Sequence, residues 1–503
     1  MSRPRRSVVF ASVTEHLPGP VVDAGRGLVF AVDRRLGRAI TSTVVAHHRR
    51  RLDRIGHARV FDAPPGGWAD ATPRRAGCSL EVLVDGEEIA PRIAAELASA
   101  TSHVYLAGWH FAADFAMVRG PEPVVLRNLL AELAERVDVY VLAWAGAPLP
   151  LFRPSRRDVT TALARLADGT RVRCAADSRE RPLHCHHEKI VVVDDRVAFV
   201  GGMDLTTESG DRFDGSSHIA RAQIGWHDVA TRIEGPAVAD VAEHFRMRWH
   251  ETTGEVLPPV ATPEPRGDLT LQIARTVPER VYDALPRGDF GIFESYLRAL
   301  RAAEQFIYLE NQFLWSPEIA EVLREKLRRP PRDDFRLLLV LPAKPATGAD
   351  DTRGLLAELI EADEGAGRLL ACTIYARHGP VSDPIYVHAK VGIVDDAWLT
   401  IGSANLNEHS LFNDTEMNVV CHDVDVVRST RLRLWAEHLE VEERELDAHP
   451  AEVIDSRWKP IALEQLERRR AHQRQTHRLV ALPHLSTRAE RLLGPMQGLL
   501  VDG

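Results

Sequence analysis

Several features that would assign a sequence to a particular class are missing from these 503 residues. No apolar run approaches the roughly 18 residues that a membrane-spanning helix requires. The five cysteines are odd in number and form no CxxC pair, so neither a disulfide framework nor a zinc site is indicated. The N-terminal apolar stretch is too short for a secretion signal. The sequence therefore favours a reduced, cytoplasmic protein and gives no sign of a cofactor.

The charge balance is unlike that of a general nucleic-acid binder. The net charge is -9, whereas such binders usually carry a basic domain. Residues 1–60 differ from the rest, because they hold twelve Arg against four acidic residues. This basic segment could lie on an anionic membrane surface, or it could be a solvated helix beside the core.

Lysine is scarce in this chain. Only five of the 63 basic residues are Lys, and the rest are Arg. Two of the five, Lys189 and Lys390, occupy the same place in a repeated pattern. Arg carries a wide planar fork, whereas Lys carries a compact point charge on a thin stem. The repeated position therefore calls for an ammonium group.

The repeated pattern is His187-x-Lys189-x4-Asp194-x6-Gly201 and His388-x-Lys390-x4-Asp395-x6-Gly402. The residue frequencies of this chain produce one such set by chance roughly once in a thousand sequences. A lone His-x-Lys is usually a solvated strand edge, but two complete copies indicate a duplicated functional unit.

The duplication extends beyond the pattern. Tyr105 precedes His187 by 82 residues, and Tyr308 precedes His388 by 80 in a similar context. Strand-like and helix-like runs alternate in both halves, which predicts an α/β fold. We expect two pseudo-twofold-related α/β sandwich lobes, each with a mixed, mostly parallel sheet flanked by helices, and a site at their interface. The predicted segments are a basic N-terminal extension (1–75), a first lobe (76–258), a Pro-rich linker (259–268), a second lobe (269–445) and a helical tail (446–503).

The residues of each copy suit a phosphodiester. Strand alternation places His and Lys, two residues apart, on the same face. The small residues that follow let backbone amides approach an anion. Two imidazoles in one site could attack phosphorus and protonate the departing alcohol, while two ammonium groups stabilise the phosphoryl oxygens. Attack and departure occur on opposite sides of phosphorus, which explains the need for two copies.

The paired motifs resemble the His-Lys-Asp signatures of the phospholipase D superfamily. Three further segments, GWHDVATRIEGPA, YLENQF and LRLWAEHL, are similar to those of its phospholipid-cleaving members. The resemblance covers most of residues 78–440 and implies chemistry without a metal ion or cofactor.

The resemblance also implies roles for individual residues. It makes His187 the nucleophile and His388 the general acid, with Asp228 and Glu416 orienting the histidine of their own half. It assigns phosphate binding to Lys189, Lys390, Ser403, Asn405 and Gly202, and structural roles to Asp194 and Asp395. Glu310 and Asn311 are headgroup candidates, or simply part of a buried strand end.

Three features lie outside these assignments. Asp204 takes the place of Asn405 in the first copy, where a carboxylate would repel phosphate unless it is paired. The polar loop from Leu205 to Gly225 follows the first motif and could line the site, or it could be a surface excursion. The run His184-Cys185-His186-His187 could bind a metal, but the sequence shows no second group of ligands for one.

The sequence thus predicts a phospholipase D-type phosphodiesterase or phosphatidyltransferase. It would act as a monomer on phospholipid at a membrane surface, with water or an alcohol as acceptor and without nucleic acid. A cardiolipin-synthase-like transferase and a nucleic-acid phosphodiesterase of the same superfamily are the alternatives. A non-catalytic scaffold is disfavoured by two intact motifs.

We expect Lys189→Arg and Lys390→Arg each to lower turnover by about 100-fold or more, although both variants retain the charge. The reason is that a guanidinium group cannot take the position of a compact ammonium in the transition state. Steady-state assays of the purified variants measure this effect. Near-normal turnover by either variant would show that the ammonium is not required.

Overall fold

The computed structural model describes residues 41–483 except 149–152, 183, 209, 220–222, 261, 344–348 and 379–380. Most of the predicted basic N-terminal extension (1–40) and the end of the predicted tail (484–503) lie outside the described residues. Residues 41–54 of the extension form a helix. It packs on the second half of the chain, where the buried His48 Nδ1 lies 2.8 Å from Glu318 Oε1.

The first lobe is a seven-stranded sheet in the order β6-β5-β2-β7-β8-β10-β1. The strands are β1 (Arg74–Val84), β2 (His103–Gly108), β5 (Asp138–Trp144), β6 (Arg173–Asp177), β7 (Lys189–Val193), β8 (Val197–Gly201) and β10 (Val229–Glu234). The helices are α2 (Asp85–Ala98), α3 (Leu126–Leu133), α4 (Arg156–Ala167) and α5 (Ala237–Thr253). The short strands β3 (Ala116–Val118) and β4 (Val124–Val125) form a separate hairpin.

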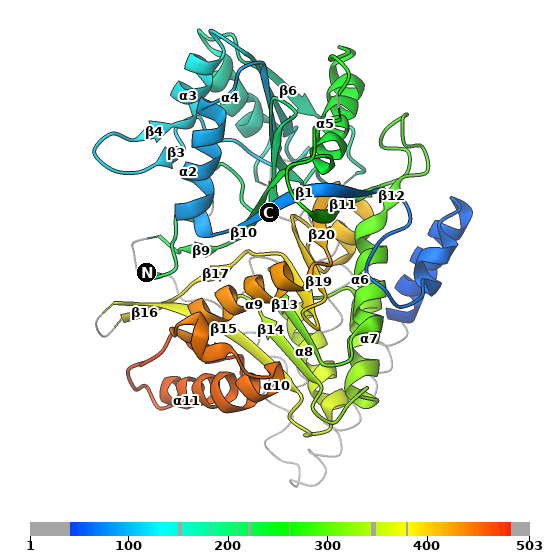
Figure 1. Ribbon diagram of the computed structural model, residues 1–503, viewed down its shortest axis with the longest axis vertical. Coiled ribbons are helices and arrows are strands. Elements are labelled where there is room, and N and C mark those ends of the chain that lie inside the picture. The colour runs from blue at the N-terminus through cyan, green and yellow to red at the C-terminus, as the bar shows by residue number, and fades with distance from the viewer. Residues whose placement is uncertain are drawn as a thin grey trace, which may run out of the picture.

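The second lobe repeats this order as β15-β14-β13-β18-β19-β20-β11. The strands are β11 (Leu269–Val277), β13 (Phe306–Glu310), β14 (Arg336–Val340), β15 (Leu369–His378), β18 (Val391–Val394), β19 (Trp398–Gly402) and β20 (Glu416–Cys421). The helices are α6 (Gly291–Ala302), α7 (Pro317–Arg328), α8 (Ala349–Asp363) and α9 (Val424–Leu439). The predicted internal duplication is therefore present strand by strand (Figure 1).

The sheets are mixed, as predicted, but they contain fewer parallel pairs than expected. Within the described residues of these two sheets, parallel pairing joins only β2 to β5 to β6, and β13 to β14 to β15. The short strands β9 (Trp226–His227) and β17 (Tyr386–Val387) form a separate parallel pair. The motif strands are antiparallel because short turns connect them, with Asp194-Asp195 and Asp395-Asp396 as the first two of three connecting residues. All four aspartates have positive φ values of 51–54°. Turns of this handedness match the twist of a hairpin.

Strand β1 joins the two sheets into one. Its C-terminal part pairs with β10, and its N-terminal part pairs with β11 of the second lobe. The register shifts between Arg75 and Cys78, at Gly77 with φ 80°. Figure 1 shows β1 and β11 together between the lobes.

The apolar core is also continuous across the boundary. One buried cluster combines Phe245 and Trp249 of α5 with Trp435 of α9 and Trp458 near the C-terminus. Two further clusters fill the space between each sheet and the remaining helices of its lobe. The lobes therefore share a core, and burying it favours their association.

Further elements complete the described chain. They are η1 (Ala58–Asp62), β9 (Trp226–His227), β12 (Asp289–Phe290), β16 (Val381–Pro384), β17 (Tyr386–Val387), η2 (His409–Asn413), η3 (Glu443–Leu446), α10 (Pro450–Val453), η4 (Ile454–Trp458), α11 (Lys459–Arg470) and β21 (Leu479–Ala481). Strand β21 pairs with β15 and extends the second sheet. None of the helices in the described part of the chain combines the length and the apolar character that crossing a membrane would require.

Asp395→Ala should destabilise the protein. The carboxylate accepts hydrogen bonds from three backbone amides, those of Glu304 (2.6 Å), Gln305 (2.8 Å) and Phe306 (2.7 Å), and the residue sits at positive φ. Hydrogen bonds to a charged group contribute about 1.5–3 kcal/mol each, so we expect the melting temperature to fall by several degrees. Thermal unfolding followed by circular dichroism measures this, with the exposed Asp333→Ala as control. Equal melting temperatures for the two variants would contradict the structural role of Asp395.

Candidate active site

The two motif histidines lie at the boundary between the lobes, and each is oriented by an acid of the opposite lobe. His187 Nδ1 lies 2.9 Å from Glu416 Oε1, and His388 Nδ1 lies 2.7 Å from Asp228 Oδ2. All four side chains are almost completely buried. The prediction that each acid serves the histidine of its own half is therefore wrong.

Backbone pairing explains the exchange of acids. The amides of His187 and Glu188 both donate to the carbonyl of Thr415, at 2.9 and 3.0 Å. The amides of His388 and Ala389 both donate to the carbonyl of His227, at 2.8 and 3.0 Å. Each of these carbonyls directly precedes an acid, so the connection places that acid beside the histidine of the other lobe.

The two lysines lie beside these histidines. Lys189 Nζ donates to the His187 carbonyl (2.6 Å) and lies 3.1 Å from Asp204 Oδ2. Lys390 Nζ donates to the His388 carbonyl (2.5 Å) and to Gln312 Oε1 (3.1 Å). The two copies are therefore equivalent in backbone contacts but differ in the partner of the ammonium group.

This difference accounts for the Asp204–Asn405 substitution between the copies. Asp204 forms an ion pair with Lys189 and accepts the Trp109 amide at 3.0 Å, which compensates its negative charge. Asn405 Nδ2 donates to Gln312 Oε1 at 3.3 Å. In the second copy the ammonium of Lys390 and the amide of Asn405 thus share the Gln312 oxygen, and the charge of the nearby Asp228 favours the ammonium form.

Burial dominates the electrostatics around His388. It raises the pKa of Asp228 to about 7, and it lowers the pKa of Lys390 to about 7. Burial and the charges of Lys390, Arg212 and Lys189 hold the pKa of His388 well below its usual value. The charge of His187 acts in the same direction, which shows that the two motifs are within electrostatic range of each other.

Arg212 is a functional candidate that sequence reasoning missed. It comes from the polar loop after the first motif, is 4% exposed, and its Nε and Nη1 have no hydrogen-bond partner within the described residues. Its guanidinium carbon lies 3.1 Å from the centroid of the Trp226 ring, which lies 4.4 Å from that of His388. The polarity and position of the loop make it a candidate for lining the site, but nothing in the sequence distinguishes Arg212 from the many other Arg of the chain.

Two predicted phosphate ligands have other partners here. The Ser403 hydroxyl donates to Glu416 and accepts the Met417 amide at 3.1 Å, so its one proton is already committed. The Gly202 amide donates to the Val229 carbonyl at 3.3 Å. A Cβ on Gly202 would lie 2.2 Å from Asp228 Oδ1, so glycine leaves room for the orienting acid. Ser403 therefore helps to position Glu416, and Gly202 leaves room for Asp228; neither contact is one to a bound anion.

The predicted structural aspartates bind backbone amides away from the histidines. Asp194 accepts the amides of Thr101 and Ser102, each at 2.8 Å, and that of His103 at 3.0 Å. These bonds hold its pKa below the usual value although burial opposes them. Asp395 makes the equivalent contacts at the start of β13. Both fix a hairpin turn to the beginning of the neighbouring strand.

The headgroup prediction for Glu310 and Asn311 is contradicted by their contacts. Glu310 is fully buried, and its oxygens lie 2.9 Å from His227 Nε2 and 2.8 Å from His438 Nε2. Asn311 Oδ1 accepts the amides of Phe313 and Leu406, at 3.2 and 3.1 Å. Both side chains hold the fold behind the site, where a headgroup has no access.

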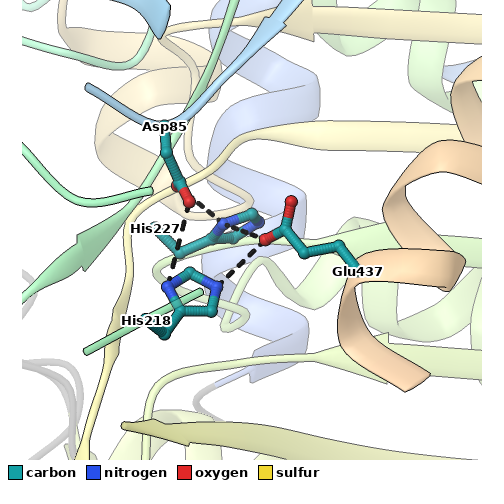
Figure 2. Close-up of side chains that lie close together, drawn as sticks. All are labelled: Asp85, His218, His227 and Glu437. Carbon is teal, nitrogen blue, oxygen red and sulfur yellow. Dashed lines mark hydrogen bonds and ion pairs between the residues drawn. The ribbon is translucent and has the colours of Figure 1, made fainter. Parts of the chain in front are cut away.

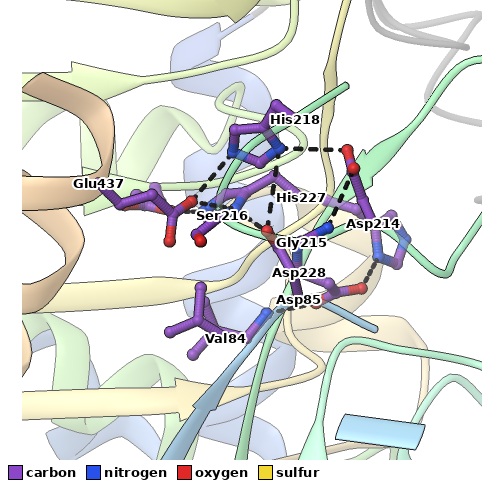
Figure 3. Close-up of polar contacts among 12 residues, drawn as sticks. Val84, Asp85, Asp214, Gly215, Ser216, His218, His227, Asp228 and Glu437 are labelled. Carbon is purple, nitrogen blue, oxygen red and sulfur yellow. Dashed lines mark hydrogen bonds and ion pairs between the residues drawn. The ribbon is translucent and has the colours of Figure 1, made fainter. Parts of the chain in front are cut away.

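Glu310 belongs to a buried charged network behind His388. His227 lies between Asp85 (2.9 Å) and Glu310. His218 lies between Asp214 (3.1 Å) and Glu437 (3.0 Å) (Figure 3). Burial alone would lower the pKa of both imidazoles, but the carboxylates outweigh it and raise the pKa of His218 to about 9 and that of His227 well above its usual value. Two imidazolium groups therefore stabilise the backbone that carries Asp228.

Three groups of side chains in the described part of the chain could hold a metal ion, and one of them, His227 with Glu310 and His438, shares His227 with the group described next. Asp85, His218, His227 and Glu437 converge with ligand atoms within 4.8 Å of one another (Figure 2). Two imidazoles and two carboxylates form a donor set that suits a divalent cation. His184, His409 and Asp414 form the remaining group, on the side of His187. The second set of ligands that the sequence did not show for His184 therefore comes from the other lobe.

Comparison with known proteins agrees with this geometry. A family model described as Phospholipase D matches residues 96–224 and 381–475, one region for each motif. The chain is 25% identical to phospholipase D A of Dictyostelium discoideum over 73% of its length, and 26% identical to phospholipase D alpha 4 of Arabidopsis thaliana over 68%. Both motif regions of the chain are therefore similar to the phospholipase D superfamily.

The similarity covers only part of the length of these relatives. The aligned regions make up 36% and 62% of those two proteins. Among solved structures, phosphatidylserine synthase from Haemophilus influenzae aligns with 84% of this chain and 97% of its own, with a TM-score of 0.50 and 14% identity. At this identity the match shows a shared fold alone.

The burial of Asp228 and Lys390 predicts a narrow pH optimum. With both pKa values at about 7, the ammonium is lost as the pH rises above neutrality and the carboxylate is lost as the pH falls below it. We expect kcat/KM on a soluble phosphodiester to be bell-shaped with apparent pKa values near neutrality. In Asp228→Asn, the fall of kcat/KM on the acidic side of the pH profile that this carboxyl causes should disappear. A flat profile between about pH 5.5 and 8.5 would contradict this account.

Proposed function

We propose that the chain is a phospholipase D-type enzyme that cleaves or transfers the phosphodiester of glycerophospholipids through a phosphohistidine. The observation that carries this proposal is the pair of buried imidazoles, each with Nδ1 on a carboxylate and each beside a lysine. Because Nδ1 is occupied, Nε2 is the nitrogen of each ring that can react.

In the first step, His187 Nε2 attacks phosphorus and an N–P bond forms. The P–O bond to the headgroup breaks, and His388 gives its Nε2 proton to the departing alcohol oxygen. In the second step, water or another alcohol attacks phosphorus, His388 takes its proton, and the N–P bond breaks. The steps use side chains of the chain alone, and the orienting acids keep the proton of each Nδ1 in place.

The cations of the site suit the phosphoryl oxygens. Lys189 and Lys390 are buried on the two sides, and Asn405 supplies an amide donor. Arg212 adds a guanidinium with unused donors next to His388. Fixed donors of this kind stabilise charge on a transferring phosphoryl group without reorganisation.

Binding of the substrate also favours the protonated form of His388, which acid catalysis requires. Burial and neighbouring cations keep His388 unprotonated, so it cannot act as an acid by itself. A phosphodiester anion beside it favours the imidazolium, because opposite charges stabilise each other in a buried site. His388 therefore becomes an acid when the substrate is bound.

The proposed substrate class rests on the relatives. Two of them are named phospholipase D, and the solved neighbour is named phosphatidylserine synthase, which suggests both hydrolysis and transfer of a phosphatidyl group. We expect the chain to reach such lipids at a membrane surface, as a monomer that carries both motifs.

A substrate panel tests the proposal. Purified protein is incubated with vesicles of phosphatidylcholine, phosphatidylethanolamine or phosphatidylglycerol, with and without a primary alcohol, and with single- and double-stranded DNA. We expect headgroup release from a lipid and, with alcohol, a phosphatidyl alcohol. His187→Ala is the control. A cardiolipin product from phosphatidylglycerol would favour the lipid-acceptor transferase, and cleavage of DNA alone would overturn the phospholipid proposal.

The two histidines should differ in phosphohistidine formation. His388→Ala should still form phosphohistidine from a nitrophenyl phosphodiester, because a nitrophenolate leaves without a proton. His187→Ala should form none, because no acid replaces a missing nucleophile. Labelled substrate, acid-free quenching and peptide mapping measure this. Label on the peptide that contains His388 would reverse the assignment while keeping the two-histidine mechanism.

A further inference from the structure

The three side chains beside His187 come together from both lobes. His184 precedes the first motif, whereas His409 begins η2 of the second lobe and Asp414 directly follows it. His184 Nδ1 lies 3.0 Å from His409 Nδ1 and 3.5 Å from Asp414 Oδ1. His409 Nδ1 lies 4.0 Å from Asp414 Oδ2. The ligand atoms therefore converge on one point from two segments that are more than 200 residues apart.

Hydrogen bonds alone do not satisfy all the polar atoms of His184, His409 and Asp414. Two facing Nδ1 atoms can share only one proton. Asp414 Oδ1 accepts the Cys185 amide at 2.9 Å, but Oδ2 is buried and has no hydrogen-bond partner within the described residues. Separations of 3.0–4.0 Å are those expected between ligands that each lie about 2.0–2.2 Å from one ion.

We propose that His184, His409 and Asp414 bind a divalent transition-metal ion that bridges the two lobes. Two imidazoles and one carboxylate suit ions such as Zn²⁺, Co²⁺ or Ni²⁺, whereas Ca²⁺ and Mg²⁺ prefer oxygen ligands. The His184 side chain is 16% exposed, so an ion can enter from solvent and water can complete its coordination.

The ion would fix the segment that orients His187. Asp414 is followed by Thr415, whose carbonyl accepts the amides of His187 and Glu188. Next to His409, Ser410 Oγ donates to Glu416 Oε1 at 2.5 Å, the oxygen that contacts His187. The site is thus a clamp between the lobes, and its existence does not depend on the reaction proposed above.

Metal-dependent thermal stability tests the proposal without using activity. Full-length, tag-free protein is stripped with chelator and unfolded with and without Co²⁺ or Zn²⁺. Saturation should raise the melting temperature by roughly 2–5 °C, because the ion binds only the folded state. Co²⁺ should also produce visible absorption bands. His184→Gln and His409→Gln should weaken binding by at least about 100-fold, while His250→Gln, an exposed histidine of α5, should match the wild type.

The other two candidate metal groups, which share His227, provide the discriminating comparison. If the stabilisation persists in His184→Gln and His409→Gln but is lost in His218→Gln or His438→Gln, the ion binds in one of those groups and the proposal is overturned. Absence of any stabilisation and of any Co²⁺ bands in the wild type would also overturn it. Should a variant fold poorly, anomalous diffraction from wild-type crystals soaked in Co²⁺ decides, since the peak must lie within bonding distance of both Nδ1 atoms.

Discussion

The exchange of orienting acids between the lobes is the constraint on which the site depends. His187 takes its partner Glu416 from the second lobe, and His388 takes Asp228 from the first. In each case the acid follows a carbonyl that binds the backbone of the opposite motif. An isolated lobe would therefore hold a histidine without its acid and an acid without its histidine. Duplication alone does not create the site; the association of the two copies does.

The fold is built to keep that association intact. Strand β1 belongs to both sheets, and one apolar cluster extends through both lobes. Behind His388, the imidazoles of His218 and His227 each lie between two carboxylates in a network that is buried except for slight exposure of Glu437. Removing one member of such a network leaves an uncompensated buried charge, which typically costs 3–5 kcal/mol. These charges specify one arrangement of the lobes, because any displacement would separate them.

The sequence predicted the features that depend on local spacing. The repeated His-x-Lys pattern, the alternation of strands and helices, and the duplication all follow from periodicity within each half. The sequence could not predict which acid faces which histidine, because that contact joins residues more than 150 positions apart. It also placed Glu310 in the site because a polar residue ends a strand there, whereas the buried His227 and His438 occupy it from behind. Arg212 could not be singled out from the sequence, because the chain contains so many Arg residues.

The difference between the copies follows from the same physics. Asp204 forms an ion pair with Lys189, while Lys390 donates to the neutral Gln312 side chain and to the His388 carbonyl. Lys390 is therefore the more strongly desolvated of the two ammonium groups. Its burial lowers its pKa. Two copies of one motif thus acquire different electrostatics, as the separate roles of nucleophile and acid require.

The imidazole ¹⁵N and Nδ1–H resonances of protein labelled at histidine test the exchanged pairing most directly. In Glu416→Gln, the signals of His187 should shift while those of His388 stay near their wild-type positions. In Asp228→Asn, the pattern should reverse. Assignment comes from the loss of each signal in His187→Ala and His388→Ala. A shift of His388 on replacement of Glu416, with His187 unchanged, would show that each acid serves its own lobe and would contradict the account.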